Sequence, residues 1–253
     1  MIKQKNAVHE DFSAHLSVRE VLSDSYETFA EAPFVFIGLS LMAAVIPMLA
    51  ELVFGSSIIA GGGLICFALI CQGTIVFMAL QCMIGEEPSL AESLRLINTR
   101  VGAMFLLVML IMFISVPGFV LYYLLKPFGF IAILVMGIFM GFVACTFLIS
   151  VHICVVEKKG AMASLRRSLE LTRGDRLSIL ILYMLTMLTS LVPAQIVSLI
   201  STVVAGPNSA GFAATLFIAL PAAFFYVMTS IIYYKLRDNK EDLSFETMAR
   251  MLK

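Results

Sequence analysis

Glu51 and His152 are two ionisable side chains that stand inside long apolar stretches of this 253-residue chain. Such a group inside a membrane-spanning segment is a candidate for proton transfer, transport or ligand binding. We expect Glu51 to face the outer interface rather than to act in transport. We expect His152 to hydrogen-bond a neighbouring helix rather than to act as a ligand. Neither has an acid, a cysteine or a second histidine at relay or ligand spacing, so the sequence indicates no metal site.

The other polar and sulfur-containing residues in these stretches also form no catalytic group. No nucleophile–base pair, carboxylate pair or metal cluster is recognisable, so we expect neither an enzymatic activity nor a cofactor. Gln72, Gln81 and Gln195 are expected to hydrogen-bond between helices. The cysteines lie in apolar runs without a CxxC pair, and we interpret them as small apolar residues. These cysteines are Cys66, Cys71, Cys82, Cys145 and Cys154.

The composition is that of an integral membrane protein. Apolar residues make up 60% of the chain and charged residues 13%, and the mean hydropathy is +1.00. Soluble domains are typically about 45–50% apolar and about 25% charged. The formal net charge is +0, which gives no reason to expect a nucleic-acid partner. Residues 1–25 are polar and lack an apolar core, so we expect no cleavable signal peptide.

Six apolar runs are long enough to cross a bilayer, which takes roughly 20 mostly apolar residues. We therefore predict an all-α integral membrane fold with six transmembrane helices in a single domain, residues 1–253. The sequence LKPFG between the third and fourth runs predicts a tight turn. Gly61–Gly63 follow no strand, and we expect an outer turn there rather than a phosphate loop. The predicted spans are Pro33–Phe54, Ala60–Ile84, Val101–Leu125, Phe128–Val156, Leu177–Ala205 and Gly211–Tyr234.

Lysine and arginine lie almost entirely on one side of this six-span layout. Sixteen of the 17 fall in the N-terminal segment, in the second-to-third and fourth-to-fifth connections, or in the C-terminal segment. Lys126 alone falls on the other side. By the positive-inside rule, both termini are predicted to lie in the cytoplasm.

Three short amphipathic segments precede the first, third and fifth spans. Ser17 with Glu20, and Ser89 with Glu92, have the spacing of a capping box at the start of a helix. The third segment, Ala161–Arg173, lacks the box but has apolar residues at helical spacing. Each segment is predicted to be a helix that lies at the membrane interface.

These elements suggest three copies of one unit: an interfacial helix, a span with a proline, an outer loop and a return span. Units with an even number of spans share one orientation and form parallel repeats. The alternative is an ordinary six-span protein whose inner loops have similar lengths. Pro47, Pro117 and Pro193 are expected to kink helices, which either opens a central cavity or has no functional consequence. The predicted units are residues 17–84, 89–156 and 161–236, followed by a cytoplasmic tail, 237–253.

Residues 157–176 form a highly charged connection between the fourth and fifth spans. A charge at the membrane centre costs about 2.5–3.5 kcal/mol, so this segment must stay in water or at the interface. Met162, Leu165 and Leu169 recur at helical spacing, which predicts a helix in the headgroup plane that ends near Gly174. Our hypothesis is that the helix contacts anionic lipid; the alternative is a signal needed only during insertion. The arginines concerned are Arg166, Arg167, Arg173 and Arg176.

The same segment contains an acidic residue, a glycine and a short basic helix of the form A-L-x-x-S-x-x-L-T-x-G. The matching residues are Glu157, Gly160, Leu165, Ser168, Leu171, Thr172 and Gly174. This pattern resembles a bacterial inner-membrane family, the glycerophosphoryl diester phosphodiesterase membrane-domain-like group with its related six-span proteins. Leu169 stands where that family often has tryptophan. The resemblance implies a multi-pass protein of the bacterial cytoplasmic membrane. We expect no phosphodiesterase domain, so the resemblance implies no catalysis.

The sequence favours a non-enzymatic integral membrane protein that binds lipid, organises the membrane or forms the membrane part of a larger assembly. Membrane lipids are the expected partners, and a protein partner is left unspecified. The alternative is a small transporter or channel with a central path between the three units. An intramembrane enzyme ranks last, because no catalytic constellation is recognisable.

Overall fold

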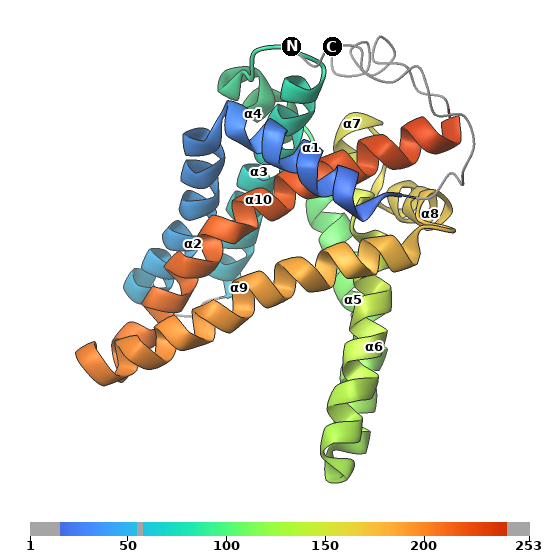
Figure 1. Ribbon diagram of the computed structural model, residues 1–253. Helices are drawn as coiled ribbons and strands as arrows, with labels where there is room; N and C mark the ends of the chain where they lie inside the picture. Colours follow the sequence, from blue (N-terminus) through green and yellow to red (C-terminus); the bar gives the residue numbers. More distant parts are fainter. Residues whose placement is uncertain (1–15, 55–57, 242–253) are drawn as a thin grey trace.

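The computed structural model describes residues 16–54 and 58–241 (Figure 1). At helical positions within 51–63, and at 205, 207–210 and 212, the backbone alone is described. The described residues form helices and no strand. The helices are α1 (Val18–Glu31), α2 (Pro33–Phe54), α3 (Ile58–Met83), α4 (Leu90–Asn98), α5 (Val101–Leu125), the 3-10 helix η1 (Lys126–Phe128), α6 (Phe130–Phe147), α7 (Ser150–Val156), α8 (Ala161–Leu171), α9 (Arg176–Ala205) and α10 (Pro207–Glu241).

The described residues contain six spans that are long and apolar enough to cross a membrane, which confirms the predicted all-α architecture. Helices α2 and α5 have the predicted bounds, whereas α10 begins earlier and ends later than its predicted span. Many large apolar side chains face outward: Phe34 is 88% exposed, Phe113 76% and Val204 80%. In water such a surface is unfavourable, so this exposure indicates a multi-pass membrane protein.

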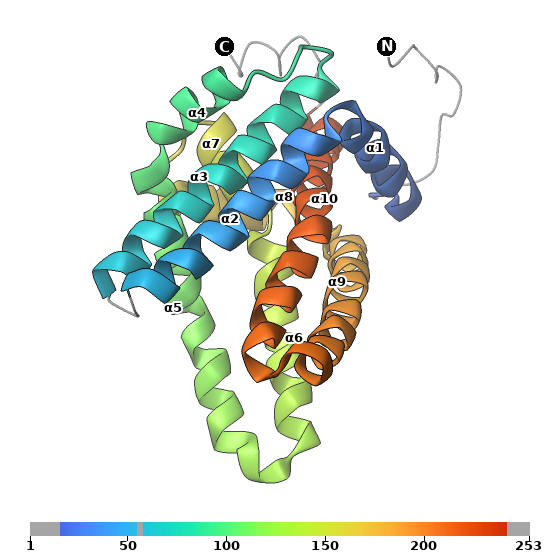
Figure 2. The same cartoon turned by 90° about the vertical axis from the view of Figure 1, so that its left-hand side faces the viewer.

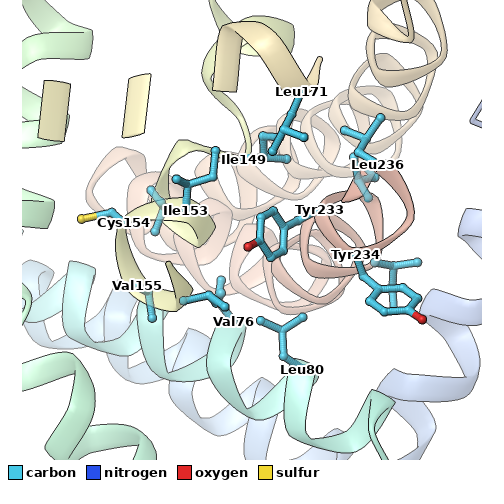
Figure 3. Packing of buried hydrophobic residues seen from close by; sticks show 14 of the residues in the cluster. Val76, Leu80, Ile149, Ile153, Cys154, Val155, Leu171, Tyr233, Tyr234 and Leu236 are labelled. Atoms are coloured by element: carbon cyan, nitrogen blue, oxygen red, sulfur yellow. The ribbon is translucent and has the colours of Figure 1, made fainter. Parts of the chain in front are cut away.

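Helices α3 and α10 form the centre of the molecule. In their membrane-spanning parts 61% and 44% of residues are buried, against 17% in α2. Figure 3 shows Tyr233 of α10 among Val76 and Leu80 of α3 and Ile153 of α7. These three helices therefore share one apolar core, and the remaining spans lie around it.

The predicted fourth span is divided into two helices, α6 and α7, by a turn at Leu148 and Ile149. The hydroxyl of Ser150 donates to the carbonyl of Phe147 at 2.6 Å, which provides a donor at the end of α6. All seven residues of α7 are buried. The division was not predicted, because no glycine or proline marks it.

The predicted LKPFG turn and the predicted end of the helix near Gly174 each contain a glycine with positive φ. Gly129 (φ 57°) follows η1 in the LKPFG turn, and Gly174 (φ 100°) lies between α8 and α9. A residue with a Cβ atom rarely adopts this conformation. The prediction for Gly61–Gly63 was wrong: these glycines continue the helix α3. Small residues are tolerated within spans because they let helix backbones approach closely.

One of the two predicted capping boxes is formed in part. The hydroxyl of Ser89 accepts from the backbone N–H of Glu92 at 3.4 Å. The backbone N–H of Ser89 donates to Gln81 of α3 rather than to Glu92. Ser17 precedes α1 but makes no side-chain cap, so that box was wrong. Gln81 also accepts from the hydroxyl of Ser93 and so connects α3 to α4, as expected of a glutamine between helices.

The order of a short helix followed by two long ones recurs three times along the chain. Figures 1 and 2 show α1, α4, α7 and α8 toward one end of the bundle, which we call the polar end, and the turns of the long hairpins toward the other. Pro47, Pro117 and Pro193 lie inside α2, α5 and α9, but α10 contains Pro221 as well. The threefold repeat and the kinks stay predictions.

Gly118 is a close-contact position in the α5–α6 hairpin, and its substitution tests the packing of these two helices. A Cβ atom there would clash with the ring of Phe139. Overpacking of this kind costs about 1–3 kcal/mol, so we expect Gly118→Ala to lower the midpoint of thermal unfolding in detergent. Gly102→Ala on the same helix is the control, because nothing lies within 4 Å of its Cβ position. Equal midpoints for the two variants would contradict the described packing.

Candidate functional site

The side chain of Glu157, directly after α7, is the centre of an ionic cluster at the polar end. It is 8% exposed. Its Oε2 lies 2.7 Å from Nζ of Lys159 and 3.7 Å from Nε of Arg167. Its Oε1 accepts from the hydroxyl of Tyr233 at 3.2 Å and lies 3.8 Å from Nη1 of Arg237. One carboxylate therefore connects the α7–α8 link with α8 and α10.

Glu241, the last residue of α10, extends the cluster. Its carboxylate accepts from Nε of Arg237 at 3.0 Å and pairs with Nη2 of Arg167. Arg237 is 4% exposed, and its Nη1 donates to the hydroxyl of Tyr233 at 2.9 Å. We call these residues the Glu157 cluster: Glu157, Lys159, Arg167, Tyr233, Arg237 and Glu241.

Charges of opposite sign compensate one another in the Glu157 cluster, where contact with water is limited. A charge withdrawn from water is costly unless another charge and hydrogen bonds compensate it. Three cations and two carboxylates leave a net charge of +1 within the cluster, and Arg237 also lies over the ring of Tyr233 at 5.7 Å. The cluster therefore holds the α7–α8 link, α8 and α10 together. This arrangement costs free energy, because five charged groups are partly removed from water.

His152 of α7 lies beside this cluster and contacts hydroxyl groups. Its Nε2 is 3.2 Å from Oγ of Ser230 and 3.3 Å from Oγ1 of Thr229, both on α10. Its ring stacks on Tyr233, with 5.7 Å between the centroids. Nδ1 is buried without a hydrogen-bond partner among the described residues. This arrangement joins α7 to α10 through a buried imidazole.

A second ionic contact closes the link between α8 and α9. Asp175 has a side chain that is 2% exposed. It accepts from the backbone N–H of Leu16 at 2.9 Å and lies 3.2 Å from Nζ of Lys240. Lys240 also donates to the carbonyls of Leu171 and Arg173, at 2.5 and 2.6 Å. A cation at the C-terminal end of a helix is favourable, so α10 also holds the end of α8.

The structure separates the four arginines for which lipid contact was predicted. The side chain of Arg166 is 86% exposed, although it approaches Glu170, and Arg173 is exposed. Arg167 is 23% exposed and belongs to the Glu157 cluster. Arg176 lies over the ring of Phe142 at 5.3 Å, and its Nε is buried without a hydrogen-bond partner among the described residues. Two of the four therefore project outward, and the other two lie against protein.

Two of the three residues in the apolar stripe of α8 face outward. Leu165 is buried, but Met162 is 67% and Leu169 39% exposed. The hydroxyl of Ser168 donates to the carbonyl of Thr146 on α6 at 2.5 Å. The segment is helical, as the periodicity predicts, and its buried residues are Ala161, Ser164, Leu165, Ser168 and Leu171. Met162 and Leu169 stay on the outer side of α8, together with Arg166.

A groove of about 650 Å³ lies between α6 and α9. Arg176 is its one charged residue, and the others are apolar residues, glycines and a cysteine. We call it the α6–α9 groove. Its lining residues are Phe130, Ile133, Leu134, Gly137, Ile138, Gly141, Phe142, Cys145, Arg176, Leu177, Leu180 and Met184.

A second pocket, of about 400 Å³, lies between α2, α3 and α10. Its polar lining residues are Ser40, Gln72, Thr215 and Tyr226, and it contains no charged residue. The prolines predicted to kink helices line neither of these two pockets. Glu51 lies in α2, but its side chain is outside the described residues.

Within the described part of the chain, no group of three or more histidine, cysteine, aspartate or glutamate residues is placed to hold a metal ion. The sequence analysis missed Arg237 and Lys240, because it predicts a tail from residue 237. Tyr233 lies within the predicted last span, and no motif marked it. Arg237 and Glu241 stand four residues apart. That spacing was the available signal that the last span continues as a helix.

These features define a class: a multi-pass helical membrane protein with an ionic cluster at one end. A family model matches residues 16–234, and the chain belongs to that family, described as a domain of unknown function (DUF7847). Neither a curated protein nor a solved structure matches the chain. The family match provides no link to the phosphodiesterase membrane-domain group that residues 157–174 resemble.

Glu157→Gln tests the importance of the cluster, because it removes the anion shared by Lys159, Arg167 and Arg237. Breaking a buried ion pair costs about 3–5 kcal/mol. Since Glu241 remains as a partner, we expect a loss of about 3 kcal/mol in the free energy of unfolding, measured by denaturant titration in mild detergent. The control is Glu170→Gln, whose exposed ion pairs are worth about 0–1 kcal/mol. A loss no larger than that of the control would show that the cluster does not stabilise the fold.

Proposed function

We propose that the protein is a non-enzymatic membrane protein of the bacterial cytoplasmic membrane that binds anionic lipid at its polar end. The observation that carries the proposal is the arrangement of α8, which is held on the protein by Arg167 and Lys240 while Arg166 and Arg173 project outward. A basic helix fixed in this way presents charge to lipid headgroups without having to fold on binding.

The exposed side of α8 supports this proposal. Met162 and Leu169 lie outward beside Arg166, and this mixture of apolar and basic residues suits the boundary between headgroups and acyl chains. Each lysine or arginine near an anionic leaflet contributes about 1 kcal/mol. The resemblance of residues 157–174 to a bacterial inner-membrane family agrees with this location. Three carboxylates surround Arg167, so we expect it to contact protein rather than lipid.

The proposal requires the polar end to face the cytoplasm, which cysteine labelling tests. In a cysteine-free background, we expect Lys126→Cys to react with an impermeant thiol reagent added to intact cells. Glu170→Cys should react only after the membrane is permeabilised. Both positions have exposed side chains, whereas the buried Ser164 would give no signal in either orientation. The opposite labelling pattern would overturn the orientation.

Lipid-dependent stability tests the binding itself. We expect phosphatidylglycerol to raise the unfolding midpoint of the purified wild type more than phosphatidylcholine with the same acyl chains does. Arg166→Gln/Arg173→Gln should lose about 1 kcal/mol of that difference for each arginine. The matched control is Arg167→Gln, which should lower the midpoint in both lipids and keep the difference. If the double variant keeps the full difference between the two lipids, these arginines do not bind lipid. The alternative, a signal needed only during membrane insertion, would then explain them.

A small transporter is the second candidate, and the pocket between α2, α3 and α10 favours it. Ser40, Gln72 and Thr215 place polar groups at membrane depth there. The hydroxyl of Ser40 is engaged with the carbonyl of Ala219 at 2.6 Å. The pocket lies between the first and third predicted units rather than between all three, so it differs from the central path that the sequence suggested. Solute flux into proteoliposomes would favour this candidate over the first.

A further inference from the structure

We infer that the α6–α9 groove is a binding site for one anionic phospholipid, with an acyl chain along the groove and the phosphate at Arg176. The inference rests on the proposed function, because it requires the polar end to lie at headgroup depth. It names a different site from the outer side of α8, so the two can fail separately.

The chemistry of the groove changes along its length as that of a phospholipid does. Arg176 stands at the first residue of α9, at the polar end. It lies over Phe142, in the last turns of α6, and the rest of the lining toward Phe130 carries no charge. An anionic group at Arg176 followed by a hydrocarbon chain therefore matches the groove in both charge and polarity.

The length of the groove suits an acyl chain. It extends along α6 from Cys145 to Phe130, and at 1.5 Å per residue this is about 22 Å. One leaflet contributes about 15 Å, half of a hydrocarbon core of about 30 Å. The groove is therefore long enough to hold an acyl chain that spans one leaflet. A volume of about 650 Å³ also lies within the usual range of small-ligand pockets, about 300–1,000 Å³. Figure 1 shows α6 and α9 diverging away from the polar end, and Phe130, Ile133 and Ile138 on α6 are exposed.

Two glycines of α6 provide room in the groove. Nothing lies within 4 Å of the Cβ position of Gly137, and the nearest atom to that of Gly141 is Cδ1 of Leu180 at 3.4 Å. Larger side chains at these positions would occupy the space that we assign to the acyl chain. Gly137 can therefore be substituted to fill the groove without displacing its neighbours.

Arg176 differs from the other arginines near it in what it contacts. Arg167 lies within 4.0 Å of three carboxylates, and Arg237 lies close to two. The described residues give Arg176 an aromatic ring and no ion pair. Its buried Nε, like that of Arg167, has no hydrogen-bond partner among them. A phosphate would supply acceptors to its guanidinium fork, and such charge-assisted pairs are strong. Ordinary bilayer lipid would fill the apolar part alone, so Arg176 is what makes the site selective.

The test is native mass spectrometry of the full chain, titrated in detergent with phosphatidylglycerol or with phosphatidylcholine of the same acyl chains. We expect one phosphatidylglycerol to bind in preference. Arg176→Gln should weaken that binding by about tenfold or more, as the loss of a charge-assisted pair predicts. Gly137→Leu should weaken the binding of both lipids. Gly102→Leu, an exposed glycine outside the groove, is the matched control and should bind as the wild type does.

The inference is wrong if the wild type binds the two lipids equally or if Arg176→Gln binds phosphatidylglycerol as the wild type does. It is also wrong if Gly137→Leu and Gly102→Leu lose equal amounts of binding, or if a second protein chain binds in place of the lipid. Competition by inorganic phosphate at the same concentration as the lipid would identify a free-anion site instead. Thermal unfolding without lipid verifies that each variant is folded. Arg166→Gln/Arg173→Gln could lose the extra stabilisation by phosphatidylglycerol while Arg176→Gln binds this lipid as the wild type does. In that case the groove is not a lipid site and the proposed function stands. If Arg176→Gln alone loses phosphatidylglycerol binding, the groove site stands and the proposed lipid contact at α8 is wrong.

Discussion

The ionic contacts of Glu157 determine where the elements of the polar end lie. Its carboxylate contacts Arg167 of α8 and Arg237 of α10, and it follows the fully buried α7. Because these charges are largely withdrawn from water, removing one leaves another uncompensated. The position of α8 is thereby coupled to those of α7 and α10. The start of α9, with Arg176, follows α8 after a four-residue link and takes its position from it.

The length of α10 makes this coupling possible. Its 35 residues extend over about 52 Å at 1.5 Å per residue, more than the roughly 40–45 Å of a whole bilayer. The helix therefore continues beyond the apolar region, and its last turns carry Arg237, Lys240 and Glu241 to α8. The buried position of α10 at the centre of the molecule gives these turns a fixed direction. A flexible tail would pay a larger entropy cost to make the same contacts.

Much of the fold follows from local rules that a single sequence contains. Long apolar runs predict α2 and α5 to the residue, and glycines with positive φ mark the turns at Gly129 and Gly174. The division between α6 and α7 has no such marker, and it depends on tertiary packing around Ile149. The candidate site was less predictable for the same reason. Periodicity identifies α8 as a helix, but contacts with distant segments decide that Leu165 faces inward and that Arg167 pairs with Glu241.

Arg167 forms ion pairs with carboxylates, whereas Arg176 contacts an aromatic ring. The difference arises because the carboxylates at this end are few and most already contact other cations. Glu157 and Glu241 are occupied by Arg167 and Arg237, and Asp175 by Lys240 and the backbone N–H of Leu16. Glu157 and Asp175 contact residues of α10 and Glu241 belongs to α10, whereas Arg176 lies over Phe142 of α6. The ionic contacts that fix α8 thus use the nearby acids and leave a cation beside the apolar groove. This is why the anion that we propose for Arg176 comes from outside the described chain; in a bilayer the nearest such anions are lipid phosphates.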